Sequence, residues 1–465
     1  MKDHSQRKVG MVSLGCAKNL VDAEIMLGDA VSHGFAVTSS PEEADVLIVN
    51  TCGFIDSAKQ ESIDAILELH RDRQTEKRAH QKLVVSGCMA QRFSSELARE
   101  IPEIDAIVGL DQVGDIGTLL QNLVESDSTQ SPLNLVARAA SRYIPDYDTP
   151  RFRLTPSHSA YLKIAEGCNH PCSFCVIPRM RGRHRSRTIS SVVGEVRSLV
   201  SQGVREINLI SQDTTFFGMD QWEQKAGPRQ PVDSQRGPTL AKLLDEIAEV
   251  EGDFWVRLLY THPAHWSDEL IEAIARNPKV VPYVDMPLQH IHEDMLLAMR
   301  RETSRQHIED LIGRLRAGIP NLALRTTFIV GFPGETSKHF EALLQFIETT
   351  RFERLGVFTY SQEEGSRAAK MENQIPTAEK NRRMRRAMML QQKIATEMAQ
   401  NQVGKDLRVL VETPHTGRTI HDAPDVDCKV ILTQDATPGE FIQAHVTDTQ
   451  VYDLVAQPYP LRSAS

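Results

Sequence analysis

The sequence contains a short segment with three closely spaced cysteines, Cys168, Cys172 and Cys175, in the pattern C-x3-C-x2-C. Short cysteine-rich segments of this kind hold iron–sulfur clusters through their thiolates. Three thiolates on a four-iron cluster leave one iron without a protein ligand, and a small molecule can bind that iron and receive an electron. Structural zinc sites take four protein ligands. A zinc site would therefore also need His170 or His184, and no second Cys/His pair follows at zinc spacing.

Three more cysteines each follow a short apolar segment in the N-terminal part of the chain. Cys16 follows residues 9–14, Cys52 follows residues 46–49, and Cys88 follows residues 83–85. Ligands of an open parallel sheet lie outside the carboxyl ends of its strands. If the three segments are neighbouring parallel strands, their cysteines converge at one edge and form a second three-thiolate site. The alternative is that they are ordinary buried cysteines at strand ends.

The elements that must position these cysteines follow from the hydrophobic pattern. Apolar strand segments at 9–14, 46–49, 83–85 and 106–108 alternate with amphipathic helices at 19–33, 55–69 and 94–100. Strands that alternate with helices indicate a doubly wound parallel sheet. We therefore predict an α/β domain over residues 1–140, followed by a linker or peripheral loop at 126–150, which is rich in Ser, Asp, Pro and Thr.

The central part of the chain repeats the strand–helix pattern six times. The predicted strands are 160–165, 206–210, 255–259, 283–286, 324–330 and 354–360, and the helices between them are 189–201, 240–248, 268–275, 305–316 and 338–349. This pattern predicts an open, partial (β/α)6 barrel over 141–400 with its chemistry at the carboxyl ends of the strands. Cys168 follows the first strand. Other strand ends carry polar groups, at 211–213, 261–263, 289–290 and 331–335, including His262 and His290, which are also typical loop residues.

The C-terminal part changes character after a basic helix predicted at 377–402. Short alternating strands at 407–411, 417–421, 429–432 and 441–446 predict a small antiparallel β-barrel, OB-like in size, over 401–465. A surface insertion is expected at 218–237. The chain is thus a multidomain α/β protein.

Composition narrows the possible functions. The chain has 465 residues with a formal net charge of −9, which disfavours broad nucleic-acid binding. No apolar run is long enough to span a bilayer, and residues 1–8 lack the apolar core of a signal peptide. Seven cysteines in a chain of this length do not make a disulfide scaffold. We expect a cytoplasmic protein that uses its cysteines for metal binding or catalysis.

The sequence around the cysteines resembles known families. The C-x3-C-x2-C segment resembles that of the radical S-adenosylmethionine (SAM) enzymes. The segments Ser13-Leu14-Gly15-Cys16-Ala17-Lys18-Asn19, Asn50-Thr51-Cys52-Gly53 and Ser86-Gly87-Cys88 resemble the N-terminal domain of the methylthiotransferases, in wording closest to the RimO branch. Residues 417–424 resemble a TRAM domain of the same branch. The resemblance extends from Val9 to about Ala456.

The resemblance implies two 4Fe–4S clusters and SAM as cofactors. Cys168, Cys172 and Cys175 would hold the radical SAM cluster, and Cys16, Cys52 and Cys88 would hold an auxiliary cluster. Phe174, Gln212 and Gly331 match positions at the SAM pocket. The implied activity is methylthiolation of the β-carbon of an aspartate in small-subunit ribosomal protein twelve, with SAM as radical source and methyl donor. The sister branch, which modifies tRNA adenosine, is the alternative, and a non-catalytic iron–sulfur electron carrier is disfavoured by the size of the chain.

The resemblance also implies partners: the ribosomal protein as substrate and a reductant such as flavodoxin, with no membrane. Binding of tRNA is not expected, because residues 403–465 contain five basic and nine acidic residues, a net charge of −4. We expect Asp422, Asp425 and Asp427 to contact the basic ribosomal protein. The alternating arginines from Arg179 to Arg187 are expected to form a solvated charged face or to contact the substrate or the SAM carboxylate.

Overall fold

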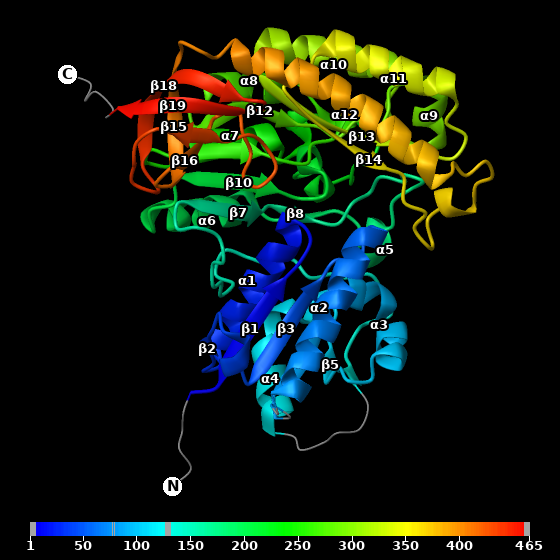
Figure 1. The fold of residues 1–465 in the computed structure, drawn as a ribbon, viewed down its shortest axis with the longest axis vertical. Helices are drawn as coiled ribbons and strands as arrows, with labels where there is room; N and C mark the ends of the chain where they lie inside the picture. The colour runs from blue at the N-terminus through cyan, green and yellow to red at the C-terminus, as the bar shows by residue number, and fades with distance from the viewer. Residues whose placement is uncertain (1–5, 77, 79, 126–131, 460–465) are drawn as a thin grey trace. The chain divides into compact units, whose positions relative to one another are not determined.

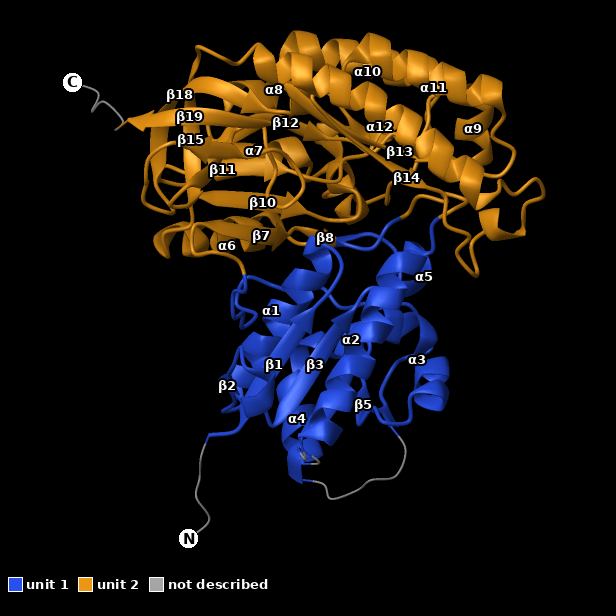
Figure 2. Ribbon diagram, in the orientation of Figure 1, with its two compact units in different colours: residues 1–154, 166–168, 175–185 blue, residues 155–165, 169–174, 186–465 orange. Residues whose placement is uncertain are grey.

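The computed structural model describes residues 6–76, 78, 80–125 and 132–459. Residues 126–131 of the predicted linker lie outside this set, as do the chain ends 1–5 and 460–465. The chain divides into two compact units, shown in Figures 1 and 2. Unit 1 comprises residues 1–154, 166–168 and 175–185, and unit 2 comprises residues 155–165, 169–174 and 186–465. Among the described residues, no helix is both long enough and apolar enough to cross a membrane.

Unit 1 is built on a six-stranded parallel sheet in the order β2-β1-β3-β4-β5-β6. Its strands are β1 (Lys8–Ser13), β2 (Ala36–Val37), β3 (Val46–Thr51), β4 (Lys82–Gly87), β5 (Ala106–Ile107) and β6 (Leu133–Asn134). Its helices are α1 (Ala17–Ser32), α2 (Asp56–Thr75), α3 (Cys88–Glu100), α4 (Ile116–Glu125) and α5 (Ile177–Met180). Every residue of β3 is buried, as expected for a central parallel strand covered on both faces. The predicted doubly wound sheet is confirmed.

Unit 2 contains a second parallel sheet, in the order β14-β13-β12-β11-β10-β7. Its strands are β7 (Ser159–Lys163), β10 (Glu206–Ile210), β11 (Trp255–Leu258), β12 (Val280–Asp285), β13 (Ala323–Val330) and β14 (Arg354–Thr359). Within the described part of the chain, β7 and β14 are the two edges of this sheet, so the predicted open barrel of six strand–helix repeats is confirmed. β12 begins before the position predicted for it. Pro282 lies just before the predicted strand but inside β12. The register between β11 and β12 shifts there, and such a position tolerates the missing N–H of proline.

Side-chain caps explain where the helices of unit 2 begin. The helices are α6 (Ile189–Ser201), α7 (Leu240–Ala248), α8 (Asp268–Arg276), α9 (Glu293–Ala298), α10 (Arg305–Gly318), α11 (Ser337–Thr350) and α12 (Thr377–Gln400). A Thr or Ser side chain accepts an N–H of the first turn at five of them, namely Thr188, Thr239, Ser267, Ser304 and Thr336. Helix α9 was not predicted, because six residues are too few for a helical period to be recognised.

The C-terminal residues form a closed five-stranded barrel in the order β15-β16-β17-β19-β18. The strands are β15 (Asp406–Thr413), β16 (Thr416–Thr419), β17 (Val430–Leu432), β18 (Phe441–Gln450) and β19 (Asp453–Tyr459). The predicted small barrel is confirmed, with one addition. Strand β19 closes the barrel by pairing parallel to β17 and antiparallel to β18.

A buried ion-pair network joins the barrel to the sheet of unit 2. Glu206 on β10 lies between Arg257 on β11 and Arg418 on β16, and all three side chains are buried. The Arg418 Nη2–Glu206 Oε2 distance is 2.5 Å and the Arg257 Nη2–Glu206 Oε1 distance is 2.9 Å. Burial acts to raise the pKa of Glu206, but the charges of Arg418 and Arg257 outweigh it and lower this pKa to about 2.

The three aspartates expected to contact the substrate lie at the same junction. Asp422 forms an ion pair with Arg354 at 2.5 Å, Asp425 accepts a hydrogen bond from Tyr161 at 3.0 Å, and Asp427 accepts one from Tyr283 at 2.6 Å. Asp422 is also only 3% exposed, so its charge is balanced inside the molecule by Arg354. The expected substrate contact is therefore wrong for Asp422, whereas Asp425 is exposed and its contact with the substrate stays a prediction. Local charge density in the sequence did not reveal partners far away in the chain.

Replacing Glu206 with Gln tests the network. The change removes the carboxylate partner of the buried Arg257 and leaves the buried Arg418 paired with Glu412 alone, and we expect it to cost unit 2 about 3–5 kcal/mol of unfolding free energy. All three tryptophans, Trp222, Trp255 and Trp266, belong to unit 2, so their fluorescence during urea unfolding reports this unit. Asp253→Asn, which removes an exposed partner of Arg408, is the control and should cost about 1 kcal/mol or less.

The network also predicts a pH dependence. A carboxylate whose pKa is lowered on folding contributes stability above its unfolded pKa and loses that contribution as the pH falls toward its folded pKa. The stability advantage of the wild type over Glu206→Gln should therefore be full above the ordinary pKa of 4.5 and decline as the pH approaches about 2. An advantage that stays constant over this range would contradict the assignment.

Candidate functional site

The three N-terminal cysteines lie at the carboxyl ends of three neighbouring strands. Strands β1, β3 and β4 are adjacent and parallel, with Ser13 paired to Asn50 and Thr51 paired to Gly87. Cys16 is the N-cap of α1, Cys52 directly follows β3, and Cys88 is the first residue of α3. The convergence predicted from the sequence is thus confirmed as geometry. Two of the thiols also stand at helix N-termini, where the helix dipole favours a thiolate.

Glycines allow the cysteine loops to approach each other closely. Gly15 has a φ of +92°, and a Cβ placed on it would lie 2.8 Å from the Cβ and 3.1 Å from the Sγ of Cys52. A Cβ on Gly53 would lie 2.8 Å from the backbone nitrogen of Met89. Both glycines therefore allow the cysteine-bearing loops to lie close together.

The electrostatics of the three thiols suit a cationic metal centre. Burial raises the pKa of Cys88 to about 11 and also raises that of Cys52, and in both cases the neighbouring cysteines oppose ionisation further. Desolvation also acts to raise the pKa of Cys16, but Lys18 and Arg181 outweigh it, so that this pKa is lowered. Metal binding removes the mutual opposition of the thiolates, because coordinated thiols are deprotonated. None of the seven cysteines, all of which lie in the described part of the chain, forms a disulfide.

The closely spaced cysteines divide between the two units. Cys168 and Cys175 belong to unit 1, where the Cys168 N–H donates to the Gly182 carbonyl at 3.1 Å. A Cβ on Gly167 would lie 2.6 Å from that same carbonyl oxygen, so the chain needs glycine there. Cys172 belongs to unit 2, where Arg301 Nη1 donates to its Sγ at 3.6 Å. Arg301 was not anticipated, since nothing near it in the sequence marks it as a partner of a cysteine.

The predicted SAM-pocket residues all lie in unit 2. Phe174 packs against a small apolar cluster formed by Met295, Met299, Phe332, Tyr360 and Ala368. Gln212 follows β10 and is half-buried. Gly331 directly follows β13 and has a φ of +73°, and its N–H donates to the Glu335 carboxylate. The structure thus places two of the three at strand ends and the third against Phe332, the neighbour of Gly331.

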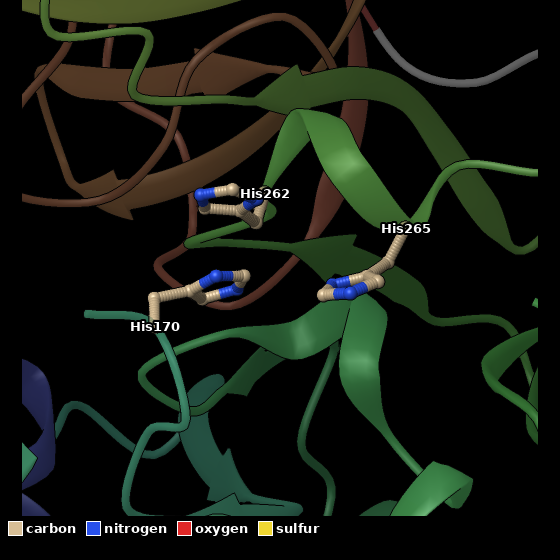
Figure 3. A group of neighbouring side chains, drawn as sticks. All are labelled: His170, His262 and His265. Atoms are coloured by element: carbon tan, nitrogen blue, oxygen red, sulfur yellow. The ribbon is translucent and has the colours of Figure 1, made fainter. Parts of the chain in front are cut away.

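His170, which lies between Cys168 and Cys172 in the sequence, belongs to a cluster of three buried histidines. His170 stacks on His262 with ring centroids 3.7 Å apart, and His265 lies beside them (Figure 3). Nδ1 of His170 lies 2.7 Å from Glu302 and Nε2 lies 2.8 Å from Asp213. Burial acts to lower the pKa of His170, but these two carboxylates raise it to about 9.

The two carboxylates at its ring nitrogens therefore favour the charged form of His170, which donates from both nitrogens. Although the ligand atoms of the three histidines lie within 4.8 Å of one another, this bonding leaves no lone pair of His170 for a metal. The zinc alternative through His170 is disfavoured on that ground. His262, considered a loop residue from the sequence, is buried, and its Nε2 has no hydrogen-bond partner.

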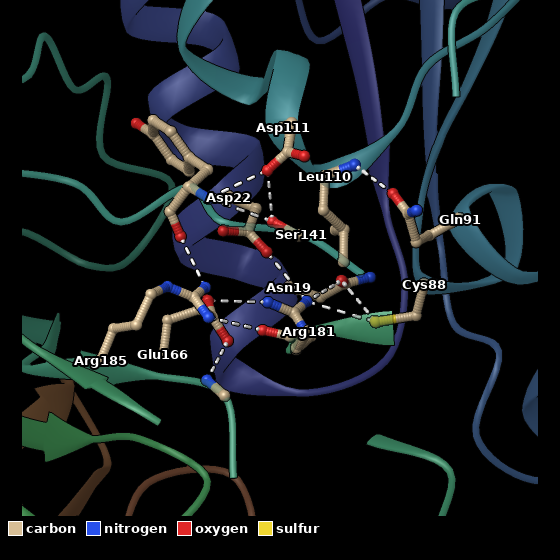
Figure 4. Close-up of polar contacts among 12 residues, drawn as sticks. Asn19, Asp22, Cys88, Gln91, Leu110, Asp111, Ser141, Glu166, Arg181 and Arg185 are labelled. Atoms are coloured by element: carbon tan, nitrogen blue, oxygen red, sulfur yellow. Dashed lines mark hydrogen bonds and ion pairs between the residues drawn. The ribbon is translucent and has the colours of Figure 1, made fainter. Parts of the chain in front are cut away.

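The alternating arginines have separate environments rather than one shared face. Arg179 and Arg183 are exposed, while Arg181 and Arg187 are buried. Arg187 forms an ion pair with Glu195 at 2.5 Å. Arg181 contacts the thiol of Cys88 and two carboxylates within unit 1 (Figure 4). The expectation of a solvated face or a substrate contact is wrong for these two buried arginines.

Comparison with known proteins decides the family. The chain is 58% identical over 455 residues to the ribosomal protein uS12 methylthiotransferase RimO of Opitutus terrae, covering 97% of this chain and 96% of that protein. The chain belongs to the RimO family. A second RimO-family protein, named in the same way, from Akkermansia muciniphila, is 50% identical over 451 residues and covers 97% of this chain and 99% of its own length.

The parts of the chain match separate families in the order seen in the structure. Residues 8–109 match the uncharacterized protein family UPF0004, residues 162–347 match the radical SAM superfamily, and residues 403–458 match the TRAM domain. Among solved structures, the radical SAM methyltransferase TsrM of Kitasatospora setae, with tryptophan substrate and a SAM analogue bound, aligns with a TM-score of 0.52 at 14% identity. That alignment covers 76% of this RimO-family chain and 73% of TsrM, and at this identity it shows a shared fold.

Replacing Gly15 with Ala tests the close approach of the cysteine loops. An alanine there meets the Cys52 side chain in addition to the strain of a positive φ. Gly34 is a matched control in the same unit, with a φ of +88° and nothing within 4 Å of an added Cβ. Gly34→Ala should pay only the backbone strain, about 1–3 kcal/mol. Gly15→Ala should cost unit 1 of the metal-free protein more, measured by hydrogen exchange of the strand amides; equal costs would contradict the steric argument.

Proposed function

We propose that this RimO-family protein methylthiolates the β-carbon of an aspartate in ribosomal protein uS12, with SAM as radical source and methyl donor. The supporting observation is the combination of two sets of three cysteines outside any disulfide with near full-length relatives named uS12 methylthiotransferases. The chemistry explains the need for such cofactors. The β-C–H bond of a carboxylate side chain yields no proton to an ordinary base, so general acid–base catalysis cannot open it.

The proposal assigns the six cysteines to two 4Fe–4S clusters. Cys168, Cys172 and Cys175 would hold one cluster and leave one iron for the amino and carboxyl groups of SAM, and Cys16, Cys52 and Cys88 would hold the other. When bound, the first cluster would supply the electron for reductive SAM cleavage and the second would present the sulfur that is transferred. The absence of disulfides at these cysteines, the glycine-lined loops and the helix N-termini at Cys16 and Cys88 fit this assignment.

Protein side chains would position the SAM-binding segment. His170 is fixed at both ring nitrogens, to Asp213 after β10 and to Glu302 after α9, and thereby anchors the residues just before Cys172 to the sheet of unit 2. The Ser173 N–H donates to the Met299 carbonyl at 2.9 Å, a second anchor on the same segment. Phe174, Gln212 and Gly331 would line the SAM pocket on this framework. His170 and Ser173 are both buried, so the two anchors are shielded from solvent.

The chain would be organised as three domains. We assign residues 1–140 to the domain with the auxiliary cluster, 141–400 to the radical SAM domain with its connecting helix, and 401–465 to the TRAM domain. The protein would act in the cytoplasm with a small reductant such as flavodoxin. The net charge of −4 over 403–465 gives the tail little capacity to neutralise the phosphates of tRNA.

Iron analysis of cysteine variants tests the ligand assignment. Cys172→Ala and the triple change of Cys16, Cys52 and Cys88 to Ala should each lower the iron content by about half, since one of two clusters is lost. SAM cleavage to deoxyadenosine should disappear in Cys172→Ala and persist in the triple variant, which forms no methylthiolated product. Cys428→Ala, which removes the seventh cysteine, is the control and should keep all its iron. Deoxyadenosine formation by Cys172→Ala would refute the assignment.

The substrate is tested by intact-mass measurement of ribosomal proteins from cells with and without this protein. We expect uS12 alone to carry the mass of one methylthio group only when the protein is present. Purified uS12 and unmodified tRNA should then be compared as substrates at the same ionic strength. Methylthio groups on tRNA bases, with uS12 unchanged, would move the protein to the tRNA-modifying branch.

A further inference from the structure

Arg181 is a buried arginine that contacts a cysteine sulfur. Its Nη2 donates to the Sγ of Cys88 at 3.2 Å and to the Asp22 carboxylate at 2.9 Å, and its Nη1 donates to the Glu166 carboxylate at 2.9 Å (Figure 4). A further donation from Nη2 reaches the side-chain oxygen of Asn19 at 3.0 Å. Arg181 is 2% exposed, and all of these partners lie in unit 1.

The partners of Arg181 come from segments that carry both sets of cysteines. Glu166 precedes Cys168 by two residues, and Arg181 itself follows Cys175 by six. Asp22 lies on α1, the helix whose N-cap is Cys16. The short helix α5 also packs on the strand-end site, because Val176 and Met180 form one apolar cluster with Cys88. One guanidinium group thus connects both flanks of the closely spaced cysteines to a strand-end sulfur.

The chemistry of the network requires arginine. A guanidinium presents several N–H donors in a rigid planar fork and can bind two carboxylates and a sulfur together, whereas a lysine ammonium is a compact point charge. The two carboxylates, Asp22 and Glu166, balance the buried positive charge. Among the four hydrogen bonds of Arg181 given above, the one to Cys88 is directed at a proposed ligand sulfur.

We propose that Arg181 is a positioning residue that raises the reduction potential of the cluster held by Cys16, Cys52 and Cys88. This inference rests on the proposed function, because it takes these cysteines as ligands. Reduction adds negative charge to a cluster and its sulfurs. A hydrogen bond and a positive charge directed at one ligand sulfur stabilise the reduced form more than the oxidised form. Loss of Arg181 should therefore make reduction harder.

The test uses the full chain with Cys168, Cys172 and Cys175 changed to Ala, so that one type of cluster remains. Iron content and the electron paramagnetic resonance spectrum of this background first establish that the cluster is bound. Its midpoint potential is then measured by titration with a chemical reductant. A background without any cluster would refute the proposed ligands and this inference together, whereas a bound cluster allows the inference to fail by itself.

Three variants separate the contributions of Arg181. Arg181→Gln removes the charge and should shift the midpoint potential to a more negative value. Arg181→Lys keeps the charge without the fork and should shift it less. The pair Asp22→Asn with Arg181→Met preserves the net charge but removes the donor to Cys88, and it should also shift the potential to a more negative value. Arg179→Gln removes an exposed charge from α5, the helix whose C-cap is Arg181, and is the matched control, expected to leave the potential unchanged.

Two results would overturn the proposal. One is an unchanged potential in the Arg181 variants that retain the cluster, or a shift no larger than that of Arg179→Gln, because the sulfur contact would then have no specific effect. The other is loss of the cluster from all three Arg181 variants while Arg179→Gln retains it. Arg181 would then be needed for assembly of the site and not for its potential.

Discussion

The parallel register of β1, β3 and β4 is the constraint on which the candidate site depends. Cysteines far apart in the sequence can face one another only if their strands run in the same direction and end at the same level of the sheet. The pairing of Thr51 with Gly87 and of Ser13 with Asn50 meets this condition. A shift of one residue in either pair would move one thiol along its strand by about 3.3 Å, more than the length of a metal–sulfur bond. The buried apolar side chains of β3 hold the register.

Buried charge organises both units in the same way. In unit 1 a guanidinium lies between two carboxylates and a thiol, and in unit 2 an imidazolium lies between two carboxylates beside Cys172. A third network, centred on Glu206, joins the TRAM barrel to the sheet. Buried ion pairs add little net stability compared with apolar packing, but each requires one arrangement of its partners. The first two networks therefore fix the orientation of the segments that carry Cys88 and Cys172, whose sulfur positions depend on it.

The sequence predicted the features that depend on local pattern. Alternation of strands and helices indicated both parallel sheets, and the position of Cys16, Cys52 and Cys88 after apolar segments indicated their convergence. Features that depend on distant partners were not predictable. Arg181 belongs to an alternating run that suggested solvent exposure, and its partner Asp22 is 159 residues away. Asp422 was misinterpreted for the same reason, since its partner Arg354 is 68 residues away. Strand β19 was missed because alternation is weak at the end of the barrel.

The place of β19 in the barrel has a consequence for local unfolding. This strand spans Asp453–Tyr459 and fills the position between β17 and β18, with one parallel and one antiparallel pairing. Detachment of β19 alone would leave β17 and β18 each with an unpaired edge, and an unpaired edge is a template for pairing with another chain. Exchange of β19 between two copies of the chain would restore both pairings, which makes this strand the element of the barrel most suited to domain swapping.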